Sequence, residues 1–235
     1  MKAWFALTKA EIKISFRNKE ALVFSYIIPL AVLGIIRIFN SERLPVFAGL
    51  LFTFLLVTAF FGMTDWIVIL RSSNLFRRVQ RLNPPKAAVW GAFFASRLVI
   101  IAIQVTLLLM LGILLYGFEG PRHCVGILSA ALLASIPLIM LGIVLAAAAK
   151  KKSVRPICGM SVMAGVFLSG AYFSQPLEIV ATIGRCLPFQ PLLILVRNGF
   201  SIEALTGIQW LNIGIWTVLL AILNLLLFKN VFYKK

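Results

Sequence analysis

Few side chains in this sequence could carry out chemistry, and they lie apart. The single histidine, His123, stands between Arg122 and Cys124, and the sequence contains neither an HExxH nor a GxSxG pattern. Zinc sites need Cys and His at short, repeated spacings, whereas Cys124, Cys158 and Cys186 share no CxxC pattern. The sequence therefore predicts neither a catalytic centre nor a metal site, and it leaves open whether Cys124 and Cys186 pair.

Two ionisable residues lie inside long apolar runs. Asp65 stands about a turn and a half from the end of one run, and Arg97 stands some three turns into the next. A charge inside a bilayer is costly, so such residues face the interior of a helix bundle or reach to its edge. We therefore expect an intramembrane pair between Asp65 and Arg97. A structural pair and a role in gating transport both remain open, but a proton relay would need more acids than this.

The segment from Arg71 to Arg81 has two distinct faces on a helical wheel. The apolar face holds Leu75, Phe76, Val79 and Leu82, and the basic face holds Arg71, Arg77, Arg78 and Arg81. The following Asn83, Pro84 and Pro85 end the helix. This pattern predicts a short amphipathic helix over about 72–82. It could lie on anionic lipid, or it could dock into a groove of another protein and transmit force to the spans on either side.

The composition determines what surrounds these residues. Hydrophobic residues make up 61% of the chain and charged residues only 13%, so one soluble domain of this length could not bury its apolar surface. The surrounding medium must be largely lipid. The net charge of +16 does not indicate a nucleic-acid partner, because the Lys and Arg residues fall between apolar runs. Their partners are expected to be anionic membrane lipids.

The apolar runs predict an all-α membrane protein with six transmembrane helices in a single domain. A bilayer core about 30 Å thick needs about 20 helical residues. Runs of that length lie at about 21–39, 45–70, 87–117, 124–149, 156–174 and 207–228. Residues 1–20 are charged and amphipathic, with aromatic side chains that suit the headgroup region, and are expected to form an interfacial helix. No cleavage pattern follows the first run, so we expect it to be retained.

The basic residues indicate the orientation, since Lys and Arg are retained on the cytoplasmic side. Seventeen of them fall on one predicted face, in the two terminal segments and near the loops at 71–86 and 150–155. Five fall on the other face, and Arg97 lies within a span. We therefore expect both termini to be cytoplasmic.

The stretch between the last two predicted spans is too long for a simple turn and too broken for a span. Pro176, Pro188 and Pro191 surround the apolar run Leu192 to Val196, and Arg197 follows it. We expect residues 175–206 to form a re-entrant or interfacial pair of helices on the outer side.

The order of these elements resembles a known family over nearly the whole chain. The sharpest local match is R-S-S-N-L-F-R-R-V-Q-R-L-N-P-P, followed by G-A-F-F-A-S-R-L, in which Leu82, Asn83, Pro84 and Arg97 stand where the family pattern has them. The outer L-P-F-Q-P followed by Arg197 is also similar. On these residues the chain resembles the ABC-2 type permeases, which are the membrane subunits of type V ABC exporters.

The resemblance implies a half-transporter in a bacterial or archaeal cell membrane. Two permeases, identical or siblings, would form the pathway above two copies of a separate ABC ATPase. The sequence has no Gly-x-x-x-x-Gly-Lys-Ser/Thr loop, so this chain would bind no cofactor, and ATP and Mg²⁺ would sit on the partner. The cargo would be an amphiphile such as a hydrophobic peptide, a lipid-linked molecule or a drug. One departure concerns ATPase docking: Ser72, Ser73 and Asn74 stand where many members carry an acidic residue and a glycine.

Two other classes of protein remain open. An ion-driven secondary carrier would bind its substrate near the midplane, where this sequence lacks acids. A membrane immunity or scaffold protein would need no pathway at all.

Overall fold

The computed structural model describes residues 43–72, 86–116, 121–149, 153–172 and 178–233, and these residues are all helix, turn or coil. Their seven helices are α4 (Arg43–Ser72), α6 (Lys86–Tyr116), α7 (Pro121–Ala148), α8 (Val154–Ser169), α9 (Glu178–Cys186), α10 (Phe189–Gly199) and α11 (Gly207–Tyr233). The predicted all-α class is confirmed over this part of the chain. The expected interfacial helix at 1–20 and the expected first span at 21–39 lie outside the described residues.

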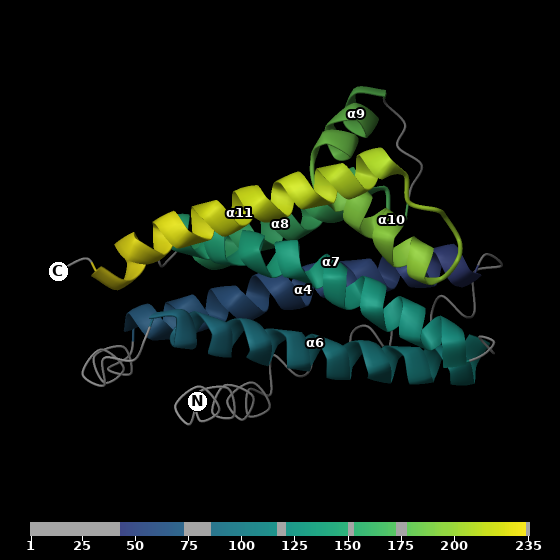
Figure 1. The fold of residues 1–235 in the computed structure, drawn as a ribbon, viewed down its shortest axis with the longest axis horizontal. Coiled ribbons are helices and arrows are strands. Elements are labelled where there is room, and N and C mark those ends of the chain that lie inside the picture. Colours follow the sequence, from purple (N-terminus) through teal and green to yellow (C-terminus); the bar gives the residue numbers. More distant parts are fainter. Residues whose placement is uncertain (1–42, 73–85, 117–120, 150–152, 173–177, 234–235) are drawn as a thin grey trace.

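The long helices run along one axis as a bundle (Figure 1). The chain alternates in direction, so Ser72, Lys86, Ala148 and Val154 lie at one end, which we call the basic end. The opposite end carries α9, which projects away from the bundle, and we call it the α9 end. This up-and-down arrangement suits long apolar helices joined by short connections.

Four described helices are long and apolar enough to cross a bilayer, through Leu44–Gly62 of α4, Gly91–Leu114 of α6, Cys124–Ala148 of α7 and Gly207–Leu227 of α11. They match four of the six expected spans. The helix α8 differs from the expected span at 156–174, because it has 16 residues and ends at Ser169. Gly170 ends it by taking φ 71°, in the left-handed region that glycine adopts without strain. The total of six spans therefore stays a prediction.

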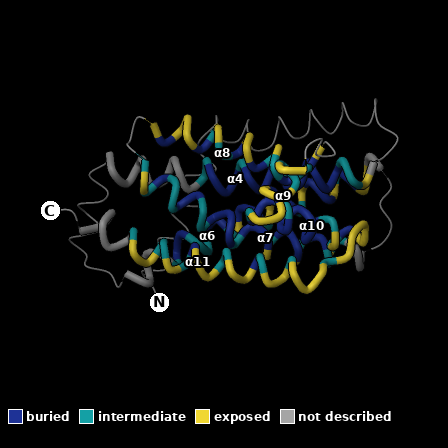
Figure 2. The backbone as a smooth tube through the Cα atoms, turned by 90° about the horizontal axis from the view of Figure 1, so that it is seen from above, coloured by how far each residue is buried: buried dark blue, intermediate teal, exposed yellow. Residues whose placement is uncertain are grey.

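The centre of the bundle is α7, which contacts α4, α6, α8, α10 and α11. Its backbone comes close to α4, since a Cβ atom placed on Gly142 would lie 2.9 Å from the Ala59 carbonyl oxygen. It comes as close to α10, where a Cβ on Gly199 would lie 2.9 Å from the Ile127 Cα. Small residues at such contacts let helix backbones pack tightly in lipid, where burial of apolar surface gives little gain. Figure 2 shows the buried residues gathered inside the bundle and exposed residues along α11.

Candidate functional site

The predicted coupling helix lies between two helices that the structure describes. Its own residues fall in the stretch 73–85, outside the described residues; they are Leu75, Phe76, Arg77, Arg78, Val79, Arg81, Leu82 and Pro84. The helix α4 ends at Ser72, α6 begins at Lys86, and the two helices contact each other. The basic segment therefore connects the ends of two packed, membrane-length helices.

Arg97 is buried between α6 and α4. Its side chain is 9% exposed, and a Cβ placed on Gly62 would lie 2.8 Å from its Nη1 atom. The guanidinium thus rests on the backbone of α4, in the space that the missing side chain of Gly62 leaves. Asp65 lies three residues after Gly62 in the same helix, less than one turn away. The structure places Arg97 beside this part of α4, and the Asp65–Arg97 ion pair itself stays a prediction.

Two further polar residues, which sequence reasoning missed, are buried in these helices. Gln104 lies two turns after Arg97 on α6 and is 3% exposed, and Thr58 lies one turn before Gly62 on α4 and is 5% exposed. Within the described part of the chain, neither Gln104 Oε1 nor Thr58 Oγ1 has a hydrogen-bond partner. Helical spacing puts Gln104 on the same face as Arg97. A search for uncharged polar residues at spacings of three, four and seven from Arg97 would have found Gln104.

The proline-broken stretch forms two short helices at the α9 end. The helices α9 and α10 meet at 79° across Leu187 and Pro188. Pro188 is the N-cap of α10, and Pro191 lies in its first turn, where a missing N–H costs no helical hydrogen bond. The structure has two helices between Glu178 and Gly199, and 175–177 lie outside the described residues. The re-entrant or interfacial placement of this pair on the outer side stays a prediction.

Two side chains of α11 bind the carbonyl end of α9, and we call them the carbonyl clamp. The Asn212 side-chain amide donates to the Arg185 carbonyl at 2.9 Å. The Trp216 indole N–H donates to the Cys186 carbonyl at 2.9 Å. These donors are four residues apart and so share one face of α11. The last carbonyls of a helix have no partner within it, so the clamp satisfies them and fixes α9 to α11.

Removing the indole donor should loosen α9. We expect Trp216→Phe to cost the folded state about 0.5–1.5 kcal/mol, the usual net contribution of one hydrogen bond. Hydrogen exchange measured by mass spectrometry should become several-fold faster in α9. Trp210→Phe is the matched control, because this ring lies on the same helix and is half exposed. Equal exchange in the two variants would contradict the clamp.

Arg197 ties α10 to neighbouring segments. Its Nη2 donates to the Gly170 carbonyl at 3.4 Å, just past the end of α8. Its Nη1 lies 3.5 Å from Glu203 Oε2, and the Asn198 side-chain amide donates to the Glu203 carbonyl at 3.1 Å. These contacts give Arg197 a structural role at the α9 end.

The cysteines and the possible metal ligands lie apart in the described part of the chain. Cys124 and Cys186 do not form a disulfide with each other in this structure. Within the searched ranges no group of His, Cys, Asp and Glu could hold a metal ion. The described residues around the basic segment form packed helices with buried polar groups. The basic segment joins two of these helices in the sequence.

Comparison with known protein families gives a match over most of the chain. A family model described as ABC-2 type transporter matches residues 2–200. The match includes the basic segment and the helices α4 to α10. No curated protein matches the chain.

Proposed function

Because the chain belongs to the ABC-2 type transporter family, we propose that it is the permease subunit of an ATP-driven exporter with a separate ATPase. The long apolar helices support a multi-pass membrane subunit. With no P-loop in the sequence, ATP and Mg²⁺ would be held by that partner. Any coupling of ATP hydrolysis to transport therefore has to pass through a contact between the two proteins.

The contact between α4 and α6, with the basic segment connecting them, carries this proposal. We assign the coupling role to the amphipathic helix at 72–82. Its apolar face, with Phe76 near the middle, docks into a groove of the ATPase, and its arginines flank that contact. A displacement of this helix acts on the ends of both spans.

Because α4 packs against several helices, a displacement of α4 would also act on them. This helix contacts α7, α8 and α10 as well as α6. A tightly packed interior transmits displacement, because its side chains leave little space to absorb it. A tilt of α4 at the basic end would therefore act on α10, and through α10 on α9, at the opposite end.

The proposed assembly has two permeases, identical or siblings, above two ATPases. Its basic end and both termini are cytoplasmic, in line with the placement of Lys and Arg in the sequence. The substrate class that best suits a chain of this composition is an amphiphile: a peptide, a lipid-linked molecule or a drug. The host would be a bacterial or archaeal cell.

Co-purification tests the proposal. Each ABC ATPase found encoded beside this gene is co-expressed with the tagged chain, and detergent extracts are purified through the tag. We expect the ATPase to be retained and its ATP hydrolysis to change when the chain is bound. Failure of every neighbouring ATPase to bind would overturn the proposal and favour a carrier or a scaffold.

A further inference from the structure

The carbonyl end of α9 lies beside the apolar stretch of α11, well away from the end of that stretch. The stretch covers the 21 residues Gly207–Leu227. The clamp donors Asn212 and Trp216 come five and nine residues after Gly207, which is about 8 and 14 Å along a helix. Because both donors bind carbonyls of α9, α9 ends within the depth range of a membrane-length helix.

The start of α10 gives a similar depth from a second helix. A Cβ atom on Gly165 of α8 would lie 3.1 Å from the Phe189 ring and 3.3 Å from Leu56 of α4, so both side chains meet the same glycine. Leu56 comes twelve residues after Leu44, where the apolar stretch of α4 begins, or about 18 Å along that helix. The turn between α9 and α10 therefore lies well inside the apolar part of the bundle.

At this depth α9 has one apolar flank and one charged flank. Gly184 is buried and marks the side of α9 that faces the bundle. On a helical wheel Ile179 and Ile183 lie on one flank, where they are 73% and 45% exposed. Glu178 and Arg185 lie on the opposite flank, and both are exposed. Lipid suits the isoleucines, but a charged side chain among acyl chains is costly unless a polar group accompanies it.

The guanidinium of Arg185 lacks such a group among the described residues. At the same end of the bundle, Arg197 is held by the Gly170 carbonyl and by Glu203. Within the described part of the chain, the Arg185 side chain makes no hydrogen bond or ion pair. Glu178 is on the same flank, but it lies seven residues away, about 10 Å along α9. The described residues thus leave an exposed cation without a counter-charge beside the apolar stretch of α11.

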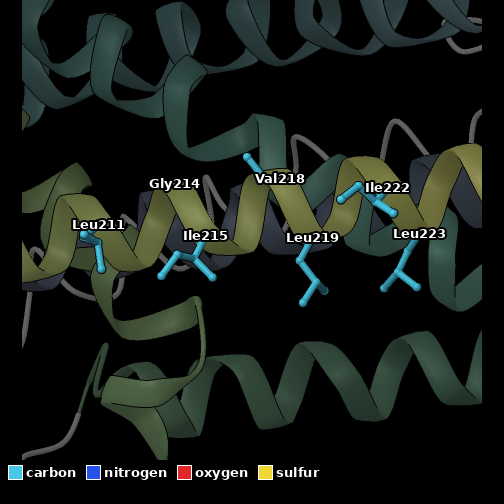
Figure 3. Close-up of a pocket in the computed structure, with 7 residues that line it drawn as sticks. All are labelled: Leu211, Gly214, Ile215, Val218, Leu219, Ile222 and Leu223. Atoms are coloured by element: carbon cyan, nitrogen blue, oxygen red, sulfur yellow. The ribbon is translucent and has the colours of Figure 1, made fainter.

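An apolar groove begins beside the clamp. It has a volume of about 770 Å³ and runs along α11 from Leu211 to Leu223 (Figure 3). Two of its lining residues, Leu211 and Ile215, directly precede the two clamp donors in the sequence. The groove therefore starts at the level of the carbonyl end of α9. A molecule with an acidic head and an apolar tail would find a cation and an apolar surface at the same level of the bundle.

We propose that Arg185 binds the anionic head group of an amphiphile whose tail lies along α11. A guanidinium fits the oxygens of a phosphate or a carboxylate, often with two parallel hydrogen bonds. Apolar surroundings strengthen this contact, because they screen the two charges less than water does. In assigning a charge to the head of the exported molecule the inference rests on the proposed function, whereas the binding itself requires no ATPase.

Native mass spectrometry of the full-length chain in detergent tests the proposal. The purified chain, with no ATPase present, is titrated with dioleoyl phosphatidate and separately with dioleoylglycerol, which differs by the phosphate alone. The variants are Arg185→Gln and Arg185→Lys. Arg155→Gln is the matched control, because it removes an exposed arginine near the basic end. The clamp binds the backbone carbonyl of Arg185, so these side-chain changes should leave it intact, and hydrogen exchange in α9 checks this.

We expect the natural chain to bind phosphatidate about tenfold more tightly than dioleoylglycerol, the usual effect of one charge-assisted hydrogen bond. Arg185→Gln should lose this preference, while Arg185→Lys should keep most of it and Arg155→Gln all of it. Inorganic phosphate at the same concentration should not displace the lipid, since it has no tail for the groove.

Two outcomes would overturn the proposal. An equal preference in Arg185→Gln and Arg155→Gln would make Arg185 a surface cation without a ligand. Displacement of the lipid by inorganic phosphate would show an anion site that needs no amphiphile. Because no ATPase takes part, either outcome is distinct from a failure of the co-purification.

Discussion

Gly142→Val should prevent α7 from packing against α4. A Cβ atom on Gly142 would lie 2.9 Å from the Ala59 carbonyl oxygen and 3.3 Å from the Phe60 Cα. Both neighbours are backbone atoms, which cannot rotate away as a side chain can. Overpacking costs about 1–3 kcal/mol and occasionally more, and we expect the upper end of that range here. Thermal unfolding in detergent and the yield of folded protein measure the loss.

Gly159→Val is the matched control. Among the residues that the structure describes, a Cβ on Gly159 would meet the ring of Phe61 alone, at 3.8 Å, which is an ordinary contact distance. Both variants put a β-branched residue into a helix, so their difference isolates the contact between α4 and α7. We expect Gly159→Val to stay within about 1 kcal/mol of the natural protein. Equal losses in the two variants would contradict the close approach of these helices.

Phe76→Asp should abolish ATP-driven export while the chain remains in the membrane. In the docking that we propose, an aspartate there would have to enter an apolar groove of the ATPase without a partner. Burying an unpaired charge costs several kcal/mol, and about 3 kcal/mol already weakens binding more than a hundredfold. Uptake of substrate into inverted vesicles measures export, and the amount of membrane-bound chain measures insertion.

Phe76→Leu is the control that separates the effect of the new charge on export from the effect of losing the phenyl ring. Leucine keeps the apolar face of the amphipathic helix, so we expect most of the export activity to remain. Changing Arg77 and Arg78 to glutamate should also abolish export, because it reverses the charge of the basic face of the helix. Export that survives Phe76→Asp would assign the segment to lipid anchoring.

The sequence predicted the long helices closely because length and charge determine them. The expected span at 45–70 is the helix Arg43–Ser72, and the one at 87–117 is Lys86–Tyr116. Each apolar run is bounded by a basic residue or a turn, which lipid excludes from its core. The end of α8 was predicted wrongly, because the apolar run continues past Gly170. A hydropathy profile carries no information on the left-handed backbone conformation with which this glycine ends the helix.

The candidate site was harder to predict, because its contacts depend on how two helices align. The sequence singled out Arg97 by its charge, but its place on Gly62 follows from the register between α6 and α4. The carbonyl clamp joins Trp216 to the backbone of Cys186, 30 residues earlier. Backbone acceptors have no residue type, so no pattern of side chains could reveal them. The coupling residues around Phe76 stay predictions.

The carbonyl clamp also bears on the order in which the protein is assembled. The donors Asn212 and Trp216 are translated 26 to 30 residues after the carbonyls that they bind. A nascent chain that has just completed α9 therefore lacks the two side chains that donate to these carbonyls in the folded protein. The end of α9 gains these hydrogen bonds only when α11 leaves the ribosome and inserts beside it. Maturation of the α9 end is thus delayed until a later helix is in the bilayer.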